Sequence, residues 1–175
     1  MKENAKIFDK IVSERRSVRI FDNETEFDPQ AVHRSIERAI LSPNSSNMQL
    51  WEFYRINSKE KLKKMTPICL GQNAAKTARE LVVIVARKDL WRQRQKANLA
   101  EMKKIYGDRT DKQATRALRY YGTIMPRYYF NDPFGVWGFI KKSIFFFSGL
   151  KRPFIRHGNA TDIRISVHKS AALAA

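Results

Sequence analysis

Arg15-Arg16-Ser17-Val18-Arg19 places three guanidinium groups and one hydroxyl group within five residues, directly after a short amphipathic segment. Guanidinium groups bind phosphate oxygens in a fork, and a serine hydroxyl adds a compact hydrogen-bond donor. This basic turn, residues 15–19, therefore suits a phosphate monoester better than a metal ion or a nucleophilic reaction. By themselves the five residues also fit a solvated surface turn, which is the commoner role of a short run of charges.

A second informative segment is the polar loop, residues 42–51, with the sequence Ser42-Pro43-Asn44-Ser45-Ser46-Asn47-Met48-Gln49-Leu50-Trp51. Its Asn and Ser side chains can hydrogen-bond a polar heterocycle or the hydroxyl groups of a ribityl chain, and Pro43 stiffens the backbone. A capped turn that enters a strand explains the same residues equally well.

The apolar spacing predicts a helix over residues 4–14, with Ile7, Phe8, Ile11 and Val12 on one face. Asp28-Pro29 begins a second helix, which Ser42-Pro43 ends. The uncharged run 81–86 predicts a buried strand. The other expected elements are a strand over 51–56 and helices over 59–65, 71–79, 89–106, 110–121 and 162–175.

The composition of the 175-residue chain fits one folded domain, residues 1–175, with 43% hydrophobic residues. The single Cys69 excludes a disulfide within the chain, and residues 1–10 are too polar for a secretory signal. We therefore expect a reducing, cytoplasmic location. The sequence holds no Cys/His cluster spaced for zinc, so we expect no metal site.

The formal net charge of +17 arises almost entirely beyond residue 54. Residues 1–54 carry eight Lys and Arg against nine Asp and Glu, whereas residues 55–119 carry 18 against six and residues 141–175 carry seven against one. Such an excess attracts nucleic acid, anionic lipid or phosphorylated ligands. No nucleic-acid-binding motif accompanies it, so we expect no specific nucleic-acid partner.

Residues 134–150 are strongly apolar, but Lys141-Lys142 interrupt them and leave neither side long enough to span a bilayer. We therefore expect no transmembrane segment. A subunit interface or a cover over the active site is our first interpretation of this stretch. An interfacial membrane helix with snorkelling lysines is the alternative.

The order of these segments resembles the N-terminal half of the nitroreductase family of flavin mononucleotide (FMN) enzymes. The shared pattern is a basic Arg-Arg-Ser-x-Arg turn, an amphipathic helix, and then a Ser-Pro-x-Ser-x-Asn-x-Gln-x-Trp loop that enters a strand. The resemblance implies an α+β fold, in which helices flank a central, mainly antiparallel sheet that includes residues 81–86. It is clearest over residues 7–86 and weaker over 162–175.

The resemblance also implies which residues bind the cofactor. The basic turn would grip the FMN phosphate, and the polar loop would reach the flavin that is bound mainly by the other subunit of a homodimer. No side chain is assigned a catalytic role, because the flavin carries the chemistry. The implied cofactor-binding residues are Arg15, Arg16, Ser17, Arg19, Pro43, Asn44, Ser45, Asn47, Gln49 and Gln72.

The activity implied by the resemblance is a ping-pong oxidoreduction. NAD(P)H would reduce the flavin, and a nitroaromatic, a quinone or a similar acceptor would then be reduced. Family members usually continue beyond the helix that starts near residue 162, so we expect that the C-terminal part of the fold is missing here. Two alternatives remain open: a basic module that binds nucleic acid or an anionic membrane, and a truncated, inactive relative of the family.

Overall fold

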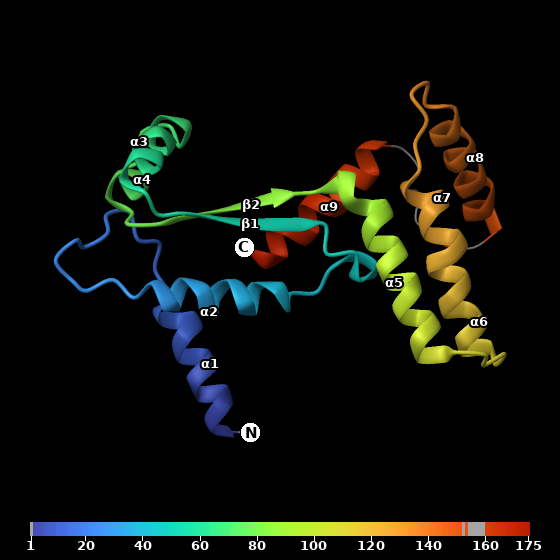
Figure 1. Cartoon of the computed structure of the whole chain (residues 1–175), viewed down its shortest axis with the longest axis horizontal. Coiled ribbons are helices and arrows are strands. Elements are labelled where there is room, and N and C mark those ends of the chain that lie inside the picture. The colour runs from blue at the N-terminus through green and yellow to red at the C-terminus, as the bar shows by residue number, and fades with distance from the viewer. Residues whose placement is uncertain (1, 152, 154–159) are drawn as a thin grey trace. The chain divides into compact units, whose positions relative to one another are not determined.

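The computed structural model describes residues 2–151, 153 and 160–175, and helices dominate its secondary structure (Figure 1). The predicted helices and strands form with ends within about three residues of those expected. The α-helices are α1 (Lys2–Glu14), α2 (Pro29–Ile40), α3 (Lys59–Ile68), α4 (Asn73–Thr77), α5 (Trp91–Tyr106), α6 (Lys112–Arg119), α7 (Met125–Tyr129), α8 (Val136–Lys151) and α9 (Ala160–Ala174). The other elements are the strands β1 (Trp51–Ile56) and β2 (Leu81–Ala86), the 3-10 turns η1 (Ser45–Asn47) and η2 (Lys88–Leu90), and the π-helical turn η3 (Tyr120–Ile124).

Local capping explains where several helices begin and end. The Ser58 hydroxyl accepts a hydrogen bond from the Lys61 backbone N–H at 3.4 Å and caps α3. The Asp111 carboxylate accepts from the N–H groups of the first turn of α6, which lowers the pKa of Asp111. Helix α5 ends at Gly107, whose φ of +51° is a conformation that glycine adopts without steric cost.

Strands β1 and β2 form a two-stranded antiparallel sheet, as the hydrogen bond from the Arg87 N–H to the Leu50 carbonyl shows. That bond, of 2.9 Å, joins the end of β2 to the beginning of β1. The prediction of a buried strand over 81–86 is wrong in its burial, because β2 is half-buried and Val82 is exposed. Each strand of a two-stranded sheet keeps one edge without a partner strand, so β2 is covered less than a central strand is.

The chain divides into two compact units, residues 1–29 with 55–83 and residues 30–54 with 84–175. The first unit contains α1, α3 and α4, and the second contains α5 to α9 and nearly all of α2. Each strand contributes residues to both units. That residues 1–175 form a single domain stays a prediction.

The core of the second unit forms under the polar loop. Met48 and Leu50 point inward from the loop and pack with side chains of α7 and α9. The buried cluster consists of Met48, Leu50, Met125, Tyr129, Ile163 and Val167. Trp91 of α5 stacks on Tyr129 at a ring distance of 5.8 Å. Figure 1 shows α5 beside the run from α6 to α7, which forms the other arm of a helical hairpin.

Polar contacts join separate segments of the first unit. The Phe21 N–H donates to the Thr77 hydroxyl at 2.9 Å and ties the segment after the basic turn to α4. Arg55 forms a two-pronged ion pair with Glu80, whose side chain is 2% exposed. The predicted apolar face of α1 forms, but its residues are exposed.

Helix α8 spans most of the strongly apolar stretch of residues 134–150. The Asp132 carboxylate accepts from the N–H groups of Val136 and Trp137 and caps the helix, which lowers the pKa of Asp132. Among the helices within the described residues, none is both long and apolar enough to cross a membrane.

Candidate functional site

The basic turn directly follows α1, and its side chains differ in how they are engaged. The Arg16 guanidinium folds back and donates to the Ser13 carbonyl at 2.7 Å and the Arg15 carbonyl at 2.9 Å. Arg16 thus caps the C-terminal end of α1, where cations are favourable. The side chains of Arg15, Ser17 and Arg19 are exposed and make no hydrogen bond or ion pair with any residue that the structure describes. Two guanidinium groups and one hydroxyl are therefore available to an anion.

An open hollow of about 340 Å³ brings two of the predicted residues together. Arg19 of the basic turn lines it with Gln72, Asn73 and Ala74, which lie at the beginning of α4. These residues are more than fifty positions apart in the sequence. The bond between Phe21 and Thr77 holds the two segments in place. A guanidinium beside two amide side chains suits an anionic ligand with polar groups.

The polar loop has an unusual backbone. Ser46, Asn47 and Gln49 adopt φ values of +56°, +48° and +48°, in the left-handed region that residues other than glycine rarely occupy. Asn44 holds this shape, because its side-chain oxygen accepts from the Gln49 N–H at 2.9 Å. Residues other than glycine that adopt the left-handed backbone conformation are common at binding sites. This conformation persists only where contacts with the surrounding structure stabilise it.

That stabilisation comes from three distant elements of the second unit. Tyr120 and Tyr121 of η3 hydrogen-bond the Ser46 hydroxyl at 2.6 Å and the Ser46 carbonyl at 3.0 Å. Asn98 of α5 donates to the Asn47 carbonyl at 2.9 Å. The Ser170 hydroxyl of α9 accepts a hydrogen bond from the Ser45 backbone N–H at 3.3 Å. The polar loop is therefore a stiff platform, not a free surface turn.

The supporting residues Tyr120, Tyr121, Asn98 and Ser170 were not predicted from the sequence. They lie 51 to 125 positions from their loop partners, and no local pattern links the two segments. The π-helical turn at 120–124 presents both tyrosines to the loop, and Gln95 of α5 donates to the Tyr121 carbonyl at 2.5 Å. Single π-turns inside helices are frequent at functional sites, but they leave no clear mark in a sequence.

Some of the predicted loop residues stabilise the loop itself, and others have side chains that are available to a ligand. The Asn44 amide is used inside the loop, since it also donates to the Ser42 carbonyl. The side chains of Ser45, Asn47 and Gln49 make no hydrogen bond with the residues described, and Pro43 is exposed. A hollow of about 10 Å³ beneath the loop is no larger than a water molecule needs, so a ligand would have to contact the exposed side.

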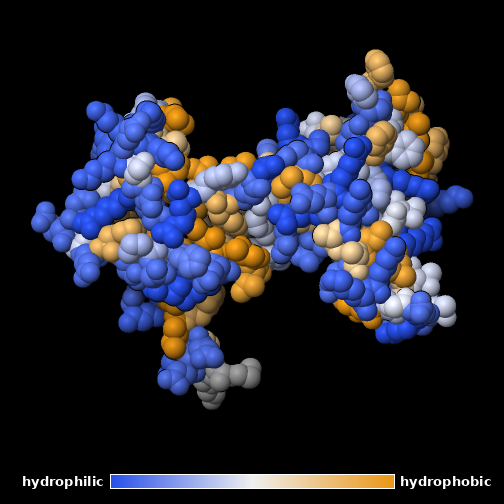
Figure 2. Space-filling view, in the orientation of Figure 1, coloured by the Kyte–Doolittle hydropathy of each residue, from blue (hydrophilic) through white to orange (hydrophobic). Residues whose placement is uncertain are grey.

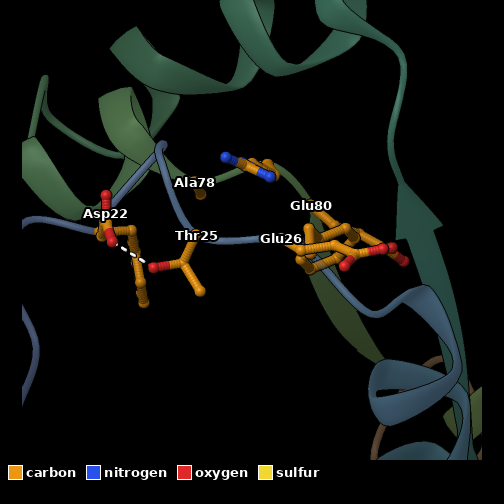
Figure 3. A pocket seen from close by; sticks show the side chains of 8 residues that line it. Asp22, Thr25, Glu26, Ala78 and Glu80 are labelled. Carbon is orange, nitrogen blue, oxygen red and sulfur yellow. Dashed lines mark hydrogen bonds between the residues drawn. The ribbon is translucent and has the colours of Figure 1, made fainter.

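A further hollow, of about 220 Å³, lies between residues 21–27 and 78–80 and was not predicted (Figure 3). Carboxylates of Asp22, Glu26 and Glu80 line it, and Figure 3 shows Asp22 bonded to Thr25. This bond lowers the pKa of Asp22. Arg79 is the cation of this lining, and it donates to the Asn23 carbonyl. Arg55 neutralises Glu80, but Asp22 and Glu26 still outnumber the single guanidinium of Arg79, so this net-negative hollow does not suit the phosphate that the basic turn suits.

The ten predicted residues thus fall into two groups, one in each compact unit. The basic turn and Gln72 belong to the first unit, and the polar loop belongs to the second. A role for any of the ten in ligand binding stays a prediction. No group of His, Cys, Asp and Glu within the described part of the chain could hold a metal ion.

Comparison with known families identifies a match to the sequence of this chain. The sequence profile of the nitroreductase family matches residues 12–127, which is more than half of the chain and includes both the basic turn and the polar loop. A comparison with curated protein sequences finds no match.

Several solved structures share the fold at low sequence identity. One, from Bacillus subtilis, is described as a nitroreductase and has 15% identity and a TM-score of 0.65. The match covers 97% of this chain and 67% of the Bacillus chain. A nitroreductase-type protein from Exiguobacterium sibiricum, crystallised with FMN, has 19% identity, a TM-score of 0.56, and coverages of 95% and 65%. A third, from Staphylococcus epidermidis, is described as an NAD(P)H:FMN oxidoreductase, with 20% identity, a TM-score of 0.54, and coverages of 95% and 66%. The chain spans about two thirds of the length of these proteins, and the α+β fold implied by the sequence is confirmed.

Proposed function

The chain belongs to the nitroreductase family, and on this premise we propose that it serves as an FMN-dependent oxidoreductase. The observation that carries the proposal is the pair of unengaged guanidinium groups, Arg15 and Arg19, beside the Ser17 hydroxyl. A phosphate monoester needs such charge and donors. The FMN in the Exiguobacterium relative and the name of the Staphylococcus relative support the choice of flavin.

The residues of this chain would bind and orient the cofactor. Arg15, Ser17 and Arg19 would hold the phosphate, and Gln72 would hydrogen-bond a more distant polar part of the same ligand from the shared hollow. Ser45, Asn47 and Gln49 would present hydrogen-bonding groups from the rigid polar loop. When bound, FMN would supply the hydride chemistry between NAD(P)H and the acceptor. The reductant would leave before a nitroaromatic or a quinone binds in its place, which gives ping-pong kinetics.

We place the cofactor between two copies of the chain, with the basic turn of one subunit and the polar loop of the other. Membership of the family supports this arrangement, because the family resemblance implies a polar loop that reaches the flavin of the other subunit. The basic turn supplies the cations that a phosphate needs, whereas the loop of Ser, Asn and Gln supplies hydrogen-bonding groups for the ring and has no cation.

Purified protein tests the proposal in two stages. It should retain or take up FMN, lose the flavin absorbance under anaerobic NADH or NADPH, and regain it when a quinone or a nitroaromatic is added. Protein that neither carries nor binds FMN would refute the proposal.

A mixing experiment tests the shared site. Arg15→Ala with Arg19→Ala, and separately Ser45→Ala with Asn47→Ala, should each abolish FMN retention. Equal mixtures of the two inactive variants, refolded together, should regain about a quarter of the wild-type occupancy, because half of the dimers would carry one intact site. A site built within one chain would regain none.

A further inference from the structure

Helix α8 buries one charged side chain and leaves many of its apolar side chains exposed. Its buried residues include Gly138 and Lys141, and the Lys141 ammonium donates to the carbonyls of Tyr128 at 2.9 Å and Phe130 at 3.0 Å. Trp137 likewise turns its ring N–H to the Arg127 carbonyl at 2.9 Å. The inward side of α8 therefore contributes hydrogen bonds to the backbone around the end of α7.

The outward side of α8 carries an apolar stripe, with Ser143 as the polar residue within it. At 3.6 residues per turn, its members fall on one side of the helix, and Phe139 is 74% exposed. Phe134, just before the helix, is 90% exposed. Figure 2 shows hydrophobic side chains gathered where Figure 1 places α8. The stripe consists of Val136, Phe139, Ile140, Ile144, Phe147 and Leu150.

Cations accompany this stripe. Exposed Lys142 borders it, and exposed Lys151 stands at its C-terminal end. Residues 87–175 also hold much of the positive charge that brings the whole chain to +17. An apolar face rich in Phe, Leu and Ile beside lysines is the composition of helices that lie on anionic membranes.

We propose that α8 docks the protein on an anionic membrane surface. The helix lies in the plane of the interface, its apolar stripe enters the boundary of the acyl chains, and Lys142 and Lys151 face the phosphates of the headgroups. The 16 residues of α8 extend about 24 Å, which is shorter than the roughly 30 Å of a hydrocarbon core. The helix is thus long enough to lie on a bilayer and too short to span it.

A bilayer fits this stripe better than a second copy of the chain does. The charges beside the stripe favour the bilayer, because headgroup phosphates can pair with Lys142 and Lys151. A second copy placed on this face would bring like charges beside Lys142 and Lys151, whereas an anionic surface brings opposite charges.

Vesicle flotation tests the proposal on the whole chain. Wild-type protein should float with phosphatidylcholine vesicles that contain phosphatidylglycerol and stay in solution with phosphatidylcholine alone. Phe139→Ser with Phe147→Ser should reduce the bound fraction at least about tenfold. The matched control is Phe8→Ser with Ile11→Ser, which removes apolar side chains of similar exposure from α1 and should leave binding unchanged. Lys142→Gln with Lys151→Gln should weaken binding, and added salt should weaken it further.

A label on α8 gives a local measurement. Ser143→Cys in a Cys69→Ser background places an environment-sensitive dye between Phe139 and Phe147, and its emission should shift to the blue on anionic vesicles. The same dye at Ser13→Cys on α1 should not shift. Circular dichroism checks that each variant is folded.

Three results would overturn the proposal. The first is wild-type protein that stays in solution with the anionic vesicles. The second is an equal loss of binding in the α1 control. In the third, Phe139→Ser with Phe147→Ser turns a dimer into a monomer while vesicle binding stays the same, which assigns the stripe to a second copy. Vesicle binding requires no flavin, so these outcomes are separate from those that test FMN binding.

Discussion

Replacing Arg19 with alanine removes a guanidinium that no described residue engages and that lines the hollow shared with Gln72. If Arg19 binds the FMN phosphate, the variant loses a hydrogen bond to a charged group, which contributes about 1.5–3 kcal/mol. FMN binding should then weaken by about 10- to 150-fold. Titration of FMN into the protein, followed by quenching of flavin fluorescence, measures this change.

Arg16→Ala is the matched control, because it removes the same functional group three positions before Arg19. The Arg16 guanidinium already donates to the carbonyls of Ser13 and Arg15, so its loss should affect the end of α1 more than the ligand. We expect the Kd for FMN to change by less than about threefold, the scale of a weak exposed interaction. If Arg16→Ala weakens binding as much as Arg19→Ala does, the assignment of roles within the basic turn is wrong.

Three further predictions concern stability and are measured by urea unfolding. Ile163→Ala empties a side-chain position that is 1% exposed and should cost about 2–5 kcal/mol, whereas Ile165→Ala on the exposed side of α9 should cost less than about 1 kcal/mol. Asn44→Ala breaks the bond that holds Gln49 in its left-handed conformation and should cost about 1–2 kcal/mol, while Asn44→Asp keeps the acceptor and should cost less. Burial lowers the pKa of Lys141 from its ordinary value of 10.5, so the unfolded chain binds the proton more tightly than the folded chain. Stability should therefore rise as the pH approaches 10.5 from below, and Lys141→Met should flatten that rise; an unchanged slope would contradict the burial argument.

The elements that the sequence predicted well are those with strong local patterns. Ser58 and Asp111 begin helices because a side-chain oxygen reaches a backbone N–H within three residues, which depends on no distant contact. The strand over 81–86 follows from six consecutive apolar or small residues, but its burial was overestimated. A run of β-branched residues predicts the extended backbone, and the number of neighbouring strands decides how far it is covered.

The candidate site was predicted in part. The composition of residues 15–19 indicates a phosphate, yet only the folded chain shows that Arg16 is turned back onto α1 while Arg15 and Arg19 are not. Likewise, the Asn and Ser residues of the polar loop suggest hydrogen bonding to a ligand. The structure shows that Asn44 serves the loop itself. Side chains of the same type thus differ in role because their nearest carbonyl and N–H groups differ.

By itself, the sequence determined the helices and strands, the family resemblance and the two polar segments, because each depends on residues within a few positions of one another. Tertiary structure alone decided how these segments are supported and which faces remain open. It brings Tyr120 and Tyr121 to Ser46, Arg19 to the hollow with Gln72, and the apolar side of α8 outward while Lys141 is buried. These features arise from contacts between residues far apart in the chain, and the energy of such contacts depends on packing that no local pattern encodes.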